Sequence, residues 1–262
     1  MSHAFPSPSA GDPDAANARA LIAACQAGTQ LDHLPQAVAT LDEAYRVQTA
    51  FVAAAGGIGG WKVSPLRPGA PPRCSPIPAP FIRSPAASVA GPRGSDWLVE
   101  IEIAVRLKAG LSPAGGAVTR AAVAAAIDTV HPAIEIVESR LVAGLDAPDL
   151  DRVADLQCCG GVILGPGRTD WQALDFSAEI AELTSGRETV RSEVVQPATG
   201  ETLDALVWLA GHAAERGSPL RAGQVIITGA RLGPLPLVAD ADAVARVGAI
   251  GTLHLPRLAA PA

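Results

Sequence analysis

The chain has 262 residues, of which 48% are hydrophobic and 18% charged, and its formal net charge is −6. This composition is typical of a globular protein rather than a disordered one, and the acidic balance with 3% aromatic residues argues against a nucleic-acid partner. We expect neither a signal peptide nor a membrane span, and the absence of a C-x-x-C spacing among four cysteines favours reduced thiols in the cytoplasm.

Two helices are predicted in the N-terminal part of the chain. The first covers residues 14–27 and ends at Gly28. The second follows Thr40, because TLDE has the capping-box pattern in which Thr40 caps the helix and Glu43 bonds back to the cap. We therefore expect a tail with helices over residues 1–58 and one larger structural unit over 59–262.

The remainder of the chain is predicted to be rich in strands. Short apolar runs predict strands at 97–107, 133–139, 160–165 and 224–229. Helices are predicted at 119–130, where His131-Pro132 ends an alanine-rich segment, and at 202–216. Since only one helix separates the first two of these strands, the order favours a mixed α+β fold with a curled sheet over a doubly wound one.

The first predicted strand, WLVEIEIAVRL, carries two glutamates within an apolar run. Alternate residues from Val99 to Leu107 are β-formers that would face a core. Because successive side chains alternate across a strand, Glu100 and Glu102 emerge from the same face, roughly 7 Å apart. Either that face is solvated, or a positive group lies against it.

A third glutamate, Glu135, lies in a strand that is apolar on both faces, so we expect it to be buried. An unpaired buried carboxylate takes up a proton unless a cation stabilises its charge. The cation is either Arg140, in a structural salt bridge, or a divalent metal shared with Glu100 and Glu102. Three carboxylates without a His or Cys set favour Mg²⁺ or Mn²⁺ over zinc. The residues alone leave both alternatives open.

Seven segments occur in the order found in the 2-keto-4-pentenoate hydratase family of the fumarylacetoacetate hydrolase superfamily, which the chain resembles over about residues 40–255. They are EAYRVQ, GWKV, VEIEIAVRL, HPAIEIVESR, ADLQCCGGVILGPG, LRAGQVIITG and GAIGTLHL. The two glutamate-bearing segments are the most specific, and the others are informative by their order. The resemblance implies a β-roll with an N-terminal helical portion, a catalytic region over 59–262, and assembly as a homo-oligomer.

The resemblance also implies a metal site and a catalytic residue. Glu100, Glu102 and Glu135 would bind Mg²⁺ or Mn²⁺, and the metal would stabilise an enolate of a small 2-oxo or 2-hydroxydienoic acid. Lys62, one of only two lysines, would be the catalytic residue. If it lies desolvated beside the metal, its pKa is lowered enough for it to move a proton; the alternative is a surface lysine.

Four further residues are candidates for substrate binding. Gln157, Thr228 and Gly229 match positions near which family members bind substrate. Arg73 lies with Arg67 and other arginines in the proline-rich loops after Lys62. These guanidinium groups either recognise a second carboxylate of the substrate, which suits their bidentate geometry, or are solvated loop charges.

The chain departs from the family after the lysine. Family hydratases carry P-D-[YF]-G there, with an Asp that assists proton transfer, but no acidic residue lies between Lys62 and Asp96. The family's ADN motif becomes ADL at Leu156, and the bulky Leu232 enters the T-G-x-x-x-G region. These changes leave the three glutamates intact but alter the expected wall of the pocket.

The expected function is that of a hydro-lyase that adds water to a 2-hydroxy-2,4-dienoate in aromatic compound catabolism. The first alternative is a 4-oxalocrotonate-like decarboxylase, because decarboxylation needs no activated water and the loop acid is missing. An acylpyruvate C–C hydrolase is the next, although no His-Glu pair stands out to activate water. The remaining alternative is a non-catalytic family member that keeps the fold and the metal.

Overall fold

The computed structural model describes residues 13–85, 98–113, 116–192, 196–238 and 241–255. Its α-helices are α1 (Pro13–Ala27), α2 (Leu41–Ala54), α3 (Arg120–Ala126), α4 (Asp149–Ala154) and α5 (Thr199–Glu215). Its strands are β1 (Ile58–Val63), β2 (Cys74–Pro78), β3 (Ile82–Arg83), β4 (Leu98–Leu107), β5 (Ile127–Val137), β6 (Cys159–Leu164), β7 (Ala181–Ser185), β8 (Glu188–Arg191), β9 (Val225–Pro236), β10 (Ala243–Val247) and β11 (Gly251–Leu255).

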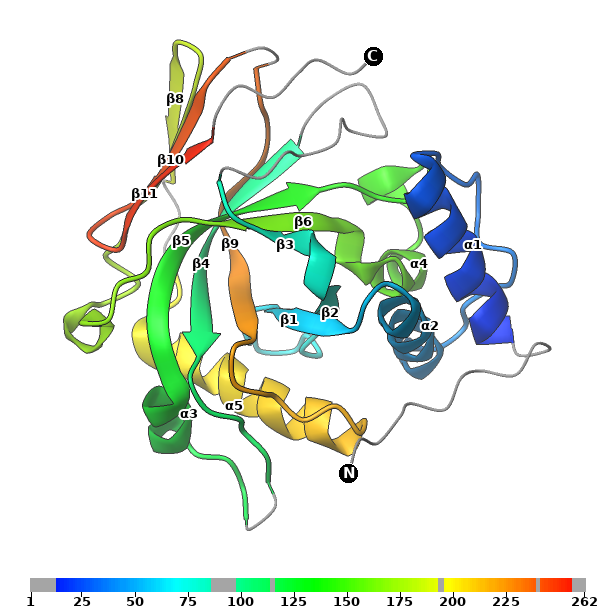
Figure 1. Cartoon of the computed structure of the whole chain (residues 1–262), viewed down its shortest axis with the longest axis horizontal. Coiled ribbons are helices and arrows are strands. Elements are labelled where there is room, and N and C mark those ends of the chain that lie inside the picture. The colour runs from blue at the N-terminus through cyan, green and yellow to red at the C-terminus, as the bar shows by residue number, and fades with distance from the viewer. Residues whose placement is uncertain (1–12, 86–97, 114–115, 193–195, 239–240, 256–262) are drawn as a thin grey trace.

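The larger sheet is mixed and strongly curled (Figure 1). Its strand order is β2-β1-β9-β4-β5-β6-β3, with parallel pairs β1/β9 and β3/β6 and antiparallel pairs elsewhere. The edge strands β2 and β3 are separated in sequence only by the 3-10 turn η1 (Ala79–Phe81). Since that connection spans at most about 14 Å, the two edges must lie close together. The predicted mixed α+β fold with a curled sheet is confirmed.

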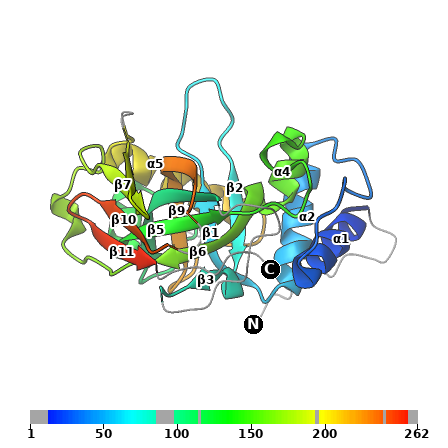
Figure 2. The ribbon, with the colours of Figure 1, turned by 90° about the horizontal axis from the view of Figure 1, so that it is seen from above.

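A smaller antiparallel sheet of order β11-β10-β7-β8 packs against one side of the larger sheet. Strands β10 and β11 contact β5, and β7 and β10 contact β4. In Figures 1 and 2 this sheet lies on the far side of the molecule from α1 and α2. The smaller sheet therefore packs on β4 and β5, the two strands that carry the glutamates.

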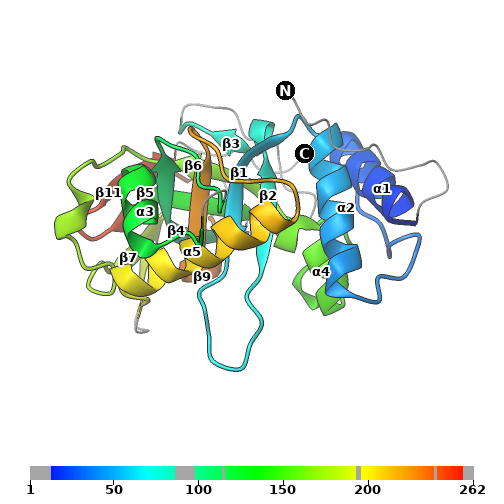
Figure 3. The same ribbon diagram turned by 90° about the horizontal axis from the view of Figure 1, so that it is seen from below.

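The helices form two groups around the larger sheet. Helices α1, α2 and α4 pack together at one side, with α2 also against β2 (Figure 2), and α5 runs across the strands with α3 at its side (Figure 3). The predicted capping box of α2 is confirmed, since Thr40 accepts from the Glu43 N–H and Glu43 accepts from the Thr40 N–H. Within the described residues, no helix combines the length and apolar character needed to cross a membrane. The boundary at residue 58 stays a prediction.

The predicted helix at 119–130 is wrong over its last four residues, 127–130. Helix α3 ends at Ala126, and β5 begins at Ile127 and runs through His131 and Pro132. Ile127 and Val130 are buried opposite residues of β4, so burial in the sheet overrides the helical preference of the preceding alanines. This early start of β5 fixes its register against β4 and hence the position of Glu135.

Candidate metal centre

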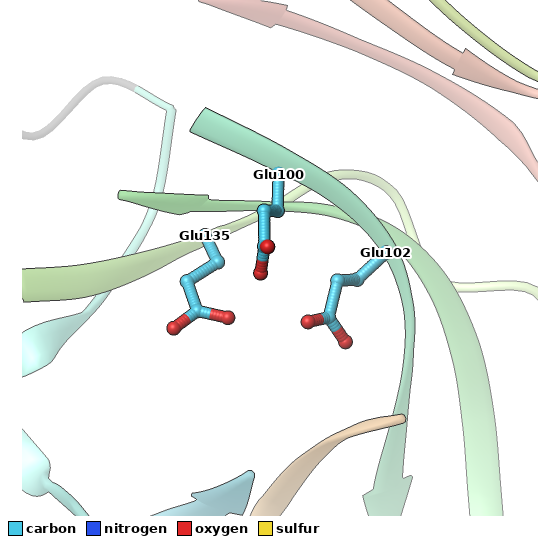
Figure 4. A group of neighbouring side chains, drawn as sticks. All are labelled: Glu100, Glu102 and Glu135. Carbon is cyan, nitrogen blue, oxygen red and sulfur yellow. The ribbon is translucent and has the colours of Figure 1, made fainter. Parts of the chain in front are cut away.

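Strand pairing brings the three glutamates together. In the antiparallel pair β4/β5, Glu100 lies directly opposite Glu135, and Glu102 follows on the same face of β4. One carboxylate oxygen of each residue lies within 4.8 Å of one from the others, and Figure 4 shows the three groups pointing into the same space. Glu102 and Glu135 are 0% exposed. The solvated-face alternative is therefore wrong for Glu102.

Lys62 lies beside these carboxylates from β1. Its Nζ is 2.8 Å from the Glu135 carboxylate and 3.5 Å from Glu100 Oε2. Desolvation acts to lower the Lys62 pKa, but attraction to Glu135 and Glu100 outweighs it and raises the pKa. The lowered pKa that we expect for Lys62 depends on a divalent cation, whose charge would oppose the field of the carboxylates.

The cluster holds more negative charge than Lys62 can balance. Burial raises the pKa of Glu102 well above its usual range, and repulsion from Glu135 raises it further. Burial also raises the pKa of Glu100. In addition, Glu102 Oε1 is buried without a hydrogen-bond partner among the described residues, whereas Lys62 Nζ lies 2.8 Å from both Glu135 oxygens. Three carboxylates that point into one space and have a single lysine beside them are a donor set that fits a hard divalent cation.

Thr228 and Gly229 of β9 lie next to Glu102. The Gly229 N–H donates a 2.6 Å hydrogen bond to Glu102 Oε2, and the Thr228 hydroxyl donates to the backbone carbonyl of Ile103 at 2.8 Å. Gly229 has a φ of +100°, and a Cβ there would lie 2.6 Å from Pro65. Glycine is therefore required where the backbone orients the Glu102 carboxylate. Substrate contact by either residue stays a prediction.

Gln157 sits in the strained turn η3 (Leu156–Cys158), where three consecutive residues have φ between 52° and 60°. Such left-handed residues cost about 1–3 kcal/mol each and persist only where surrounding contacts hold them. The Gln157 amide donates to Ser75 Oγ at 2.9 Å. Ser75 lies opposite Lys62 in the β1/β2 pair, so Gln157 is held on the Lys62 side of the site.

Ser75 and Gln48 are site residues that sequence reasoning missed. Ser75 is 0% exposed, and Gln48 of α2 donates to its hydroxyl at 2.9 Å. The register that places Ser75 opposite Lys62 is a property of the β1–β2 hairpin. No local pattern gives that register, so the sequence offers no signal for Ser75, whereas Gln48 belongs to the EAYRVQ segment already noted.

Arg73 forms a bidentate ion pair with Asp149 of α4, with both N–O distances at 2.6 Å. It ends the β1–β2 connection, which projects from the body of the protein in Figures 2 and 3. Arg67, in the same loop, is exposed. Since Asp149 already engages the Arg73 guanidinium, a substrate carboxylate would have to compete for it. The role of Arg73 in substrate binding stays a prediction.

Arg140 does not pair with Glu135, so that alternative is wrong. Arg140 and Asp155 form an ion pair in which both side chains are 0% exposed. Asp155 also accepts hydrogen bonds from the Ser139 hydroxyl and the Arg140 backbone N–H. This pair ties the segment after β5 to the residue that precedes the strained turn η3.

Comparisons with known proteins agree with this geometry, although no protein-family profile matches the chain. The chain is 36% identical over 143 residues to 2-hydroxyhexa-2,4-dienoate hydratase of Comamonas testosteroni, covering 55% of this chain and 53% of that protein. It is 38% identical over 117 residues to 2-keto-4-pentenoate hydratase of Paraburkholderia xenovorans, covering 45% and 43%. The chain thus spans about half the length of the curated relatives it matches.

A solved structure extends the likeness to nearly the whole fold. The 4-oxalocrotonate decarboxylase from Pseudomonas putida G7, complexed with magnesium and adipate, superposes with a TM-score of 0.75 at 22% identity. The superposition covers 92% of this chain and 95% of that one. At this identity the likeness establishes the fold. The chain is thus similar in sequence, over about half its length, to hydratases of 2-hydroxyhexa-2,4-dienoate and 2-keto-4-pentenoate, and similar in fold to a 4-oxalocrotonate decarboxylase.

Proposed function

We propose that the protein is a divalent-metal-dependent hydro-lyase that adds water to a small 2-hydroxy-2,4-dienoic acid. The observation that carries this proposal is the convergence of Glu100, Glu102 and Glu135 beside Lys62. The curated relatives are named as hydratases of 2-hydroxyhexa-2,4-dienoate and 2-keto-4-pentenoate, which supports the substrate class.

Glu100, Glu102 and Glu135 would hold Mg²⁺ or Mn²⁺, the ions that all-oxygen sites prefer. A bound cation supplies Lewis-acid stabilisation of negative charge on a substrate oxygen. With three protein ligands, the cation would still be open to a 2-oxo acid and to water. The fold neighbour that was crystallised with magnesium and adipate supports this choice of ion.

The residues around the carboxylates would bind the substrate and move its protons. Hydration requires a proton to leave the 2-hydroxyl and join the terminal carbon, after which water adds across the remaining double bond. Lys62, whose Nζ lies 2.8 Å from Glu135, would carry that proton. Gln157, Thr228, Gly229 and Arg73 would contact the substrate, and Gly229 already orients Glu102.

A decarboxylase acting on a 4-oxalocrotonate-like acid is the second candidate. The observation that favours it is that the segment after Lys62 lacks the acid of the hydratase pattern, and that the residue opposite Lys62 is Ser75 of β2. A hydroxyl is a much weaker base than a carboxylate, so activation of water is less well supported. Decarboxylation releases CO₂ and leaves an enolate, for which water is not a reactant.

Incubation of the full chain and Mg²⁺ with 2-hydroxypenta-2,4-dienoate and with 4-oxalocrotonate separates these functions. We expect dienol absorbance to fall without release of CO₂. Release of CO₂ from 4-oxalocrotonate would identify the decarboxylase instead, and cleavage of an acylpyruvate would identify the C–C hydrolase. Binding of both acids without turnover would identify a non-catalytic family member.

We also propose that the protein is a cytoplasmic homo-oligomer of aromatic compound catabolism. The family resemblance supports assembly, and light scattering on the purified protein tests it. The four cysteines, all within the described ranges, form no disulfide, which is consistent with a reducing compartment.

A further inference from the structure

Three polar side chains connect the N-terminal helix α2 to the candidate metal centre. Gln48 of α2 donates a hydrogen bond to Ser75 Oγ at 2.9 Å, and Gln157 of the turn η3 donates to the same oxygen at 2.9 Å. Ser75 lies directly opposite Lys62 in the β1/β2 pair, so the two side chains leave the same face of the sheet with Cβ atoms about 4.5–5.5 Å apart. The Gln157 amide is thereby held beside Lys62.

The buried end of this connection is fixed in one orientation. Gln48 is 1% exposed and Ser75 is 0% exposed. The Gln48 amide nitrogen also donates to the backbone carbonyl of Val153 in α4, and only the nitrogen of an amide can donate to a carbonyl. The same nitrogen faces Ser75, so the serine oxygen accepts from Gln48. Two separate elements, α2 and α4, therefore restrain the Ser75 hydroxyl.

Gln157 is the accessible end of the connection. Its side chain is half-buried rather than buried, and its φ of 52° is left-handed. Non-glycine residues in this conformation are strained and cluster at active sites and ligand clamps. Ser75 is the one hydrogen-bond partner of the Gln157 amide among the described residues. The amide oxygen and the second N–H are therefore free to bind a molecule beside Lys62.

We infer that Ser75 and Gln48 are positioning residues, which hold the Gln157 amide in the orientation that binds the substrate. The inference rests on the proposed function, because the molecule beside Lys62 is then the 2-hydroxydienoic acid. A serine oxygen has two lone pairs, and Gln48 and Gln157 use both. Since Ser75 is also 0% exposed, it is neither a substrate contact nor the base that activates water, and it acts through Gln157.

Loss of the Ser75 hydroxyl should weaken substrate binding through the freedom that Gln157 gains. Without its buried partner, the Gln157 amide samples several rotamers, and the substrate must then immobilise it at an entropic cost. The cost falls on the ground state and the transition state alike, so it raises KM and leaves kcat nearly unchanged.

A double-mutant cycle of Ser75→Ala and Gln157→Ala tests the inference. Calorimetry measures binding of 2-oxopentanoate, a saturated analogue, in the presence of Mg²⁺, and the dienol assay measures KM and kcat with 2-hydroxypenta-2,4-dienoate. We expect each single variant to weaken binding and raise KM roughly five- to tenfold, with kcat changed by less than about twofold. The double variant should bind as Gln157→Ala does, because Ser75 acts only through Gln157.

Two further variants complete the design. Gln48→Met keeps an unbranched side chain but loses its donor, so it should resemble Ser75→Ala and decides the matter where Ser75→Ala impairs folding. Ser185→Ala is the matched control, because Ser185 is also buried and accepts a hydrogen bond, from the Val238 N–H at 2.8 Å, but lies in the smaller sheet. It should bind 2-oxopentanoate as wild type does.

The outcomes separate this inference from the proposed function. Wild-type affinity in both Ser75→Ala and Gln48→Met, or single effects that multiply in the double variant, would overturn the inference while wild-type hydration still stands. A fall in kcat without a rise in KM for Ser75→Ala would also overturn it, because Ser75 would then act in the chemical step. Wild-type protein that neither binds 2-oxopentanoate nor consumes the dienoate would overturn the proposed function and the inference with it.

Discussion

The protein buries carboxylates in two neighbouring places, and only one of them is balanced. Asp155 faces Arg140, and its oxygens accept bonds from the Arg140 guanidinium, the Arg140 backbone and the Ser139 hydroxyl. Glu100 and Glu135 share the ammonium group of Lys62, and Glu102 keeps a buried oxygen, Oε1, without a hydrogen-bond partner among the described residues. We call Arg140 and Asp155 the closed pair, because their charges balance each other within the protein. We call Glu100, Glu102 and Glu135 the open cluster, because their negative charge is balanced only when a further cation joins Lys62.

The largest expected effect follows from breaking the open cluster. Glu135→Gln keeps the shape of the side chain but removes a charged ligand oxygen, so we expect Mg²⁺ binding to be lost and dienol turnover to fall roughly thousandfold, about 4 kcal/mol of barrier. Calorimetry with Mg²⁺ and Mn²⁺ and the dienol absorbance assay measure the two effects. Glu188→Gln on exposed β8 is the matched control. Undiminished cation uptake by Glu135→Gln would refute the site.

Substitution in the closed pair should lower the stability of the protein rather than its catalytic rate. Asp155→Asn leaves the guanidinium of Arg140 buried without a counter-charge, and we expect a loss of about 3–5 kcal/mol in the free energy of unfolding. Denaturant melts measure it, with Asp32→Asn at an exposed position as the control. The double variant Arg140→Met/Asp155→Asn should recover much of the loss. A loss below about 1 kcal/mol in the free energy of unfolding of Asp155→Asn would mean that the buried pair matters no more than a surface ion pair, which would contradict the closed pair.

The two regions also differ in how far the sequence predicts them. Alternation in β4 places Glu100 and Glu102 on one face, and the apolar neighbours of Glu135 predict its burial; both expectations agree with the structure. The sequence does not supply the partner of Arg140, because Asp155 lies 15 residues further along the chain, directly before a turn of left-handed residues that no local pattern marks.

Local sequence patterns also fail to predict which residues of two paired strands lie opposite each other. Glu100 lies opposite Glu135 in a β4/β5 register that extends back to Ile127, three residues before the predicted end of the helix. Ser75 faces Lys62 across a ten-residue connection, 64–73, whose length gives no register. Both pairings arise from contacts distant in sequence, so a pattern read along the chain identifies the residues but not their neighbours.

Addition of the missing cation should stabilise the open cluster. At a Mg²⁺ concentration 100 times its dissociation constant, we expect the free energy of unfolding to rise by about 2.7 kcal/mol through linkage. Thermal unfolding with Mg²⁺ and with EDTA measures this change. Asp155→Asn should keep the whole increment, although it begins from a lower stability. An increment that Glu135→Gln retains would place the cation elsewhere.

The smallest expected effect distinguishes the two regions most clearly. Replacing a carboxylate by an amide should lower the free energy of unfolding at Asp155 but raise it at Glu102 when no metal is present. In EDTA, Glu102→Gln should raise the free energy of unfolding by about 1 kcal/mol, since it removes a buried charge that nothing balances. The folded-state pKa of Glu102 is raised, so the folded chain holds this proton to higher pH than the unfolded chain, and wild-type stability falls as pH rises above about 4.

The advantage of Glu102→Gln should therefore be absent below about pH 4, where both states of the wild type are protonated, and grow toward neutral pH. With saturating Mg²⁺ the sign reverses, because the amide is a poorer ligand than the carboxylate that it replaces. Denaturant midpoints across pH, with and without EDTA, measure both changes. A Glu102→Gln protein that is less stable than wild type in EDTA at pH 7 would mean that the cluster is already balanced without a metal.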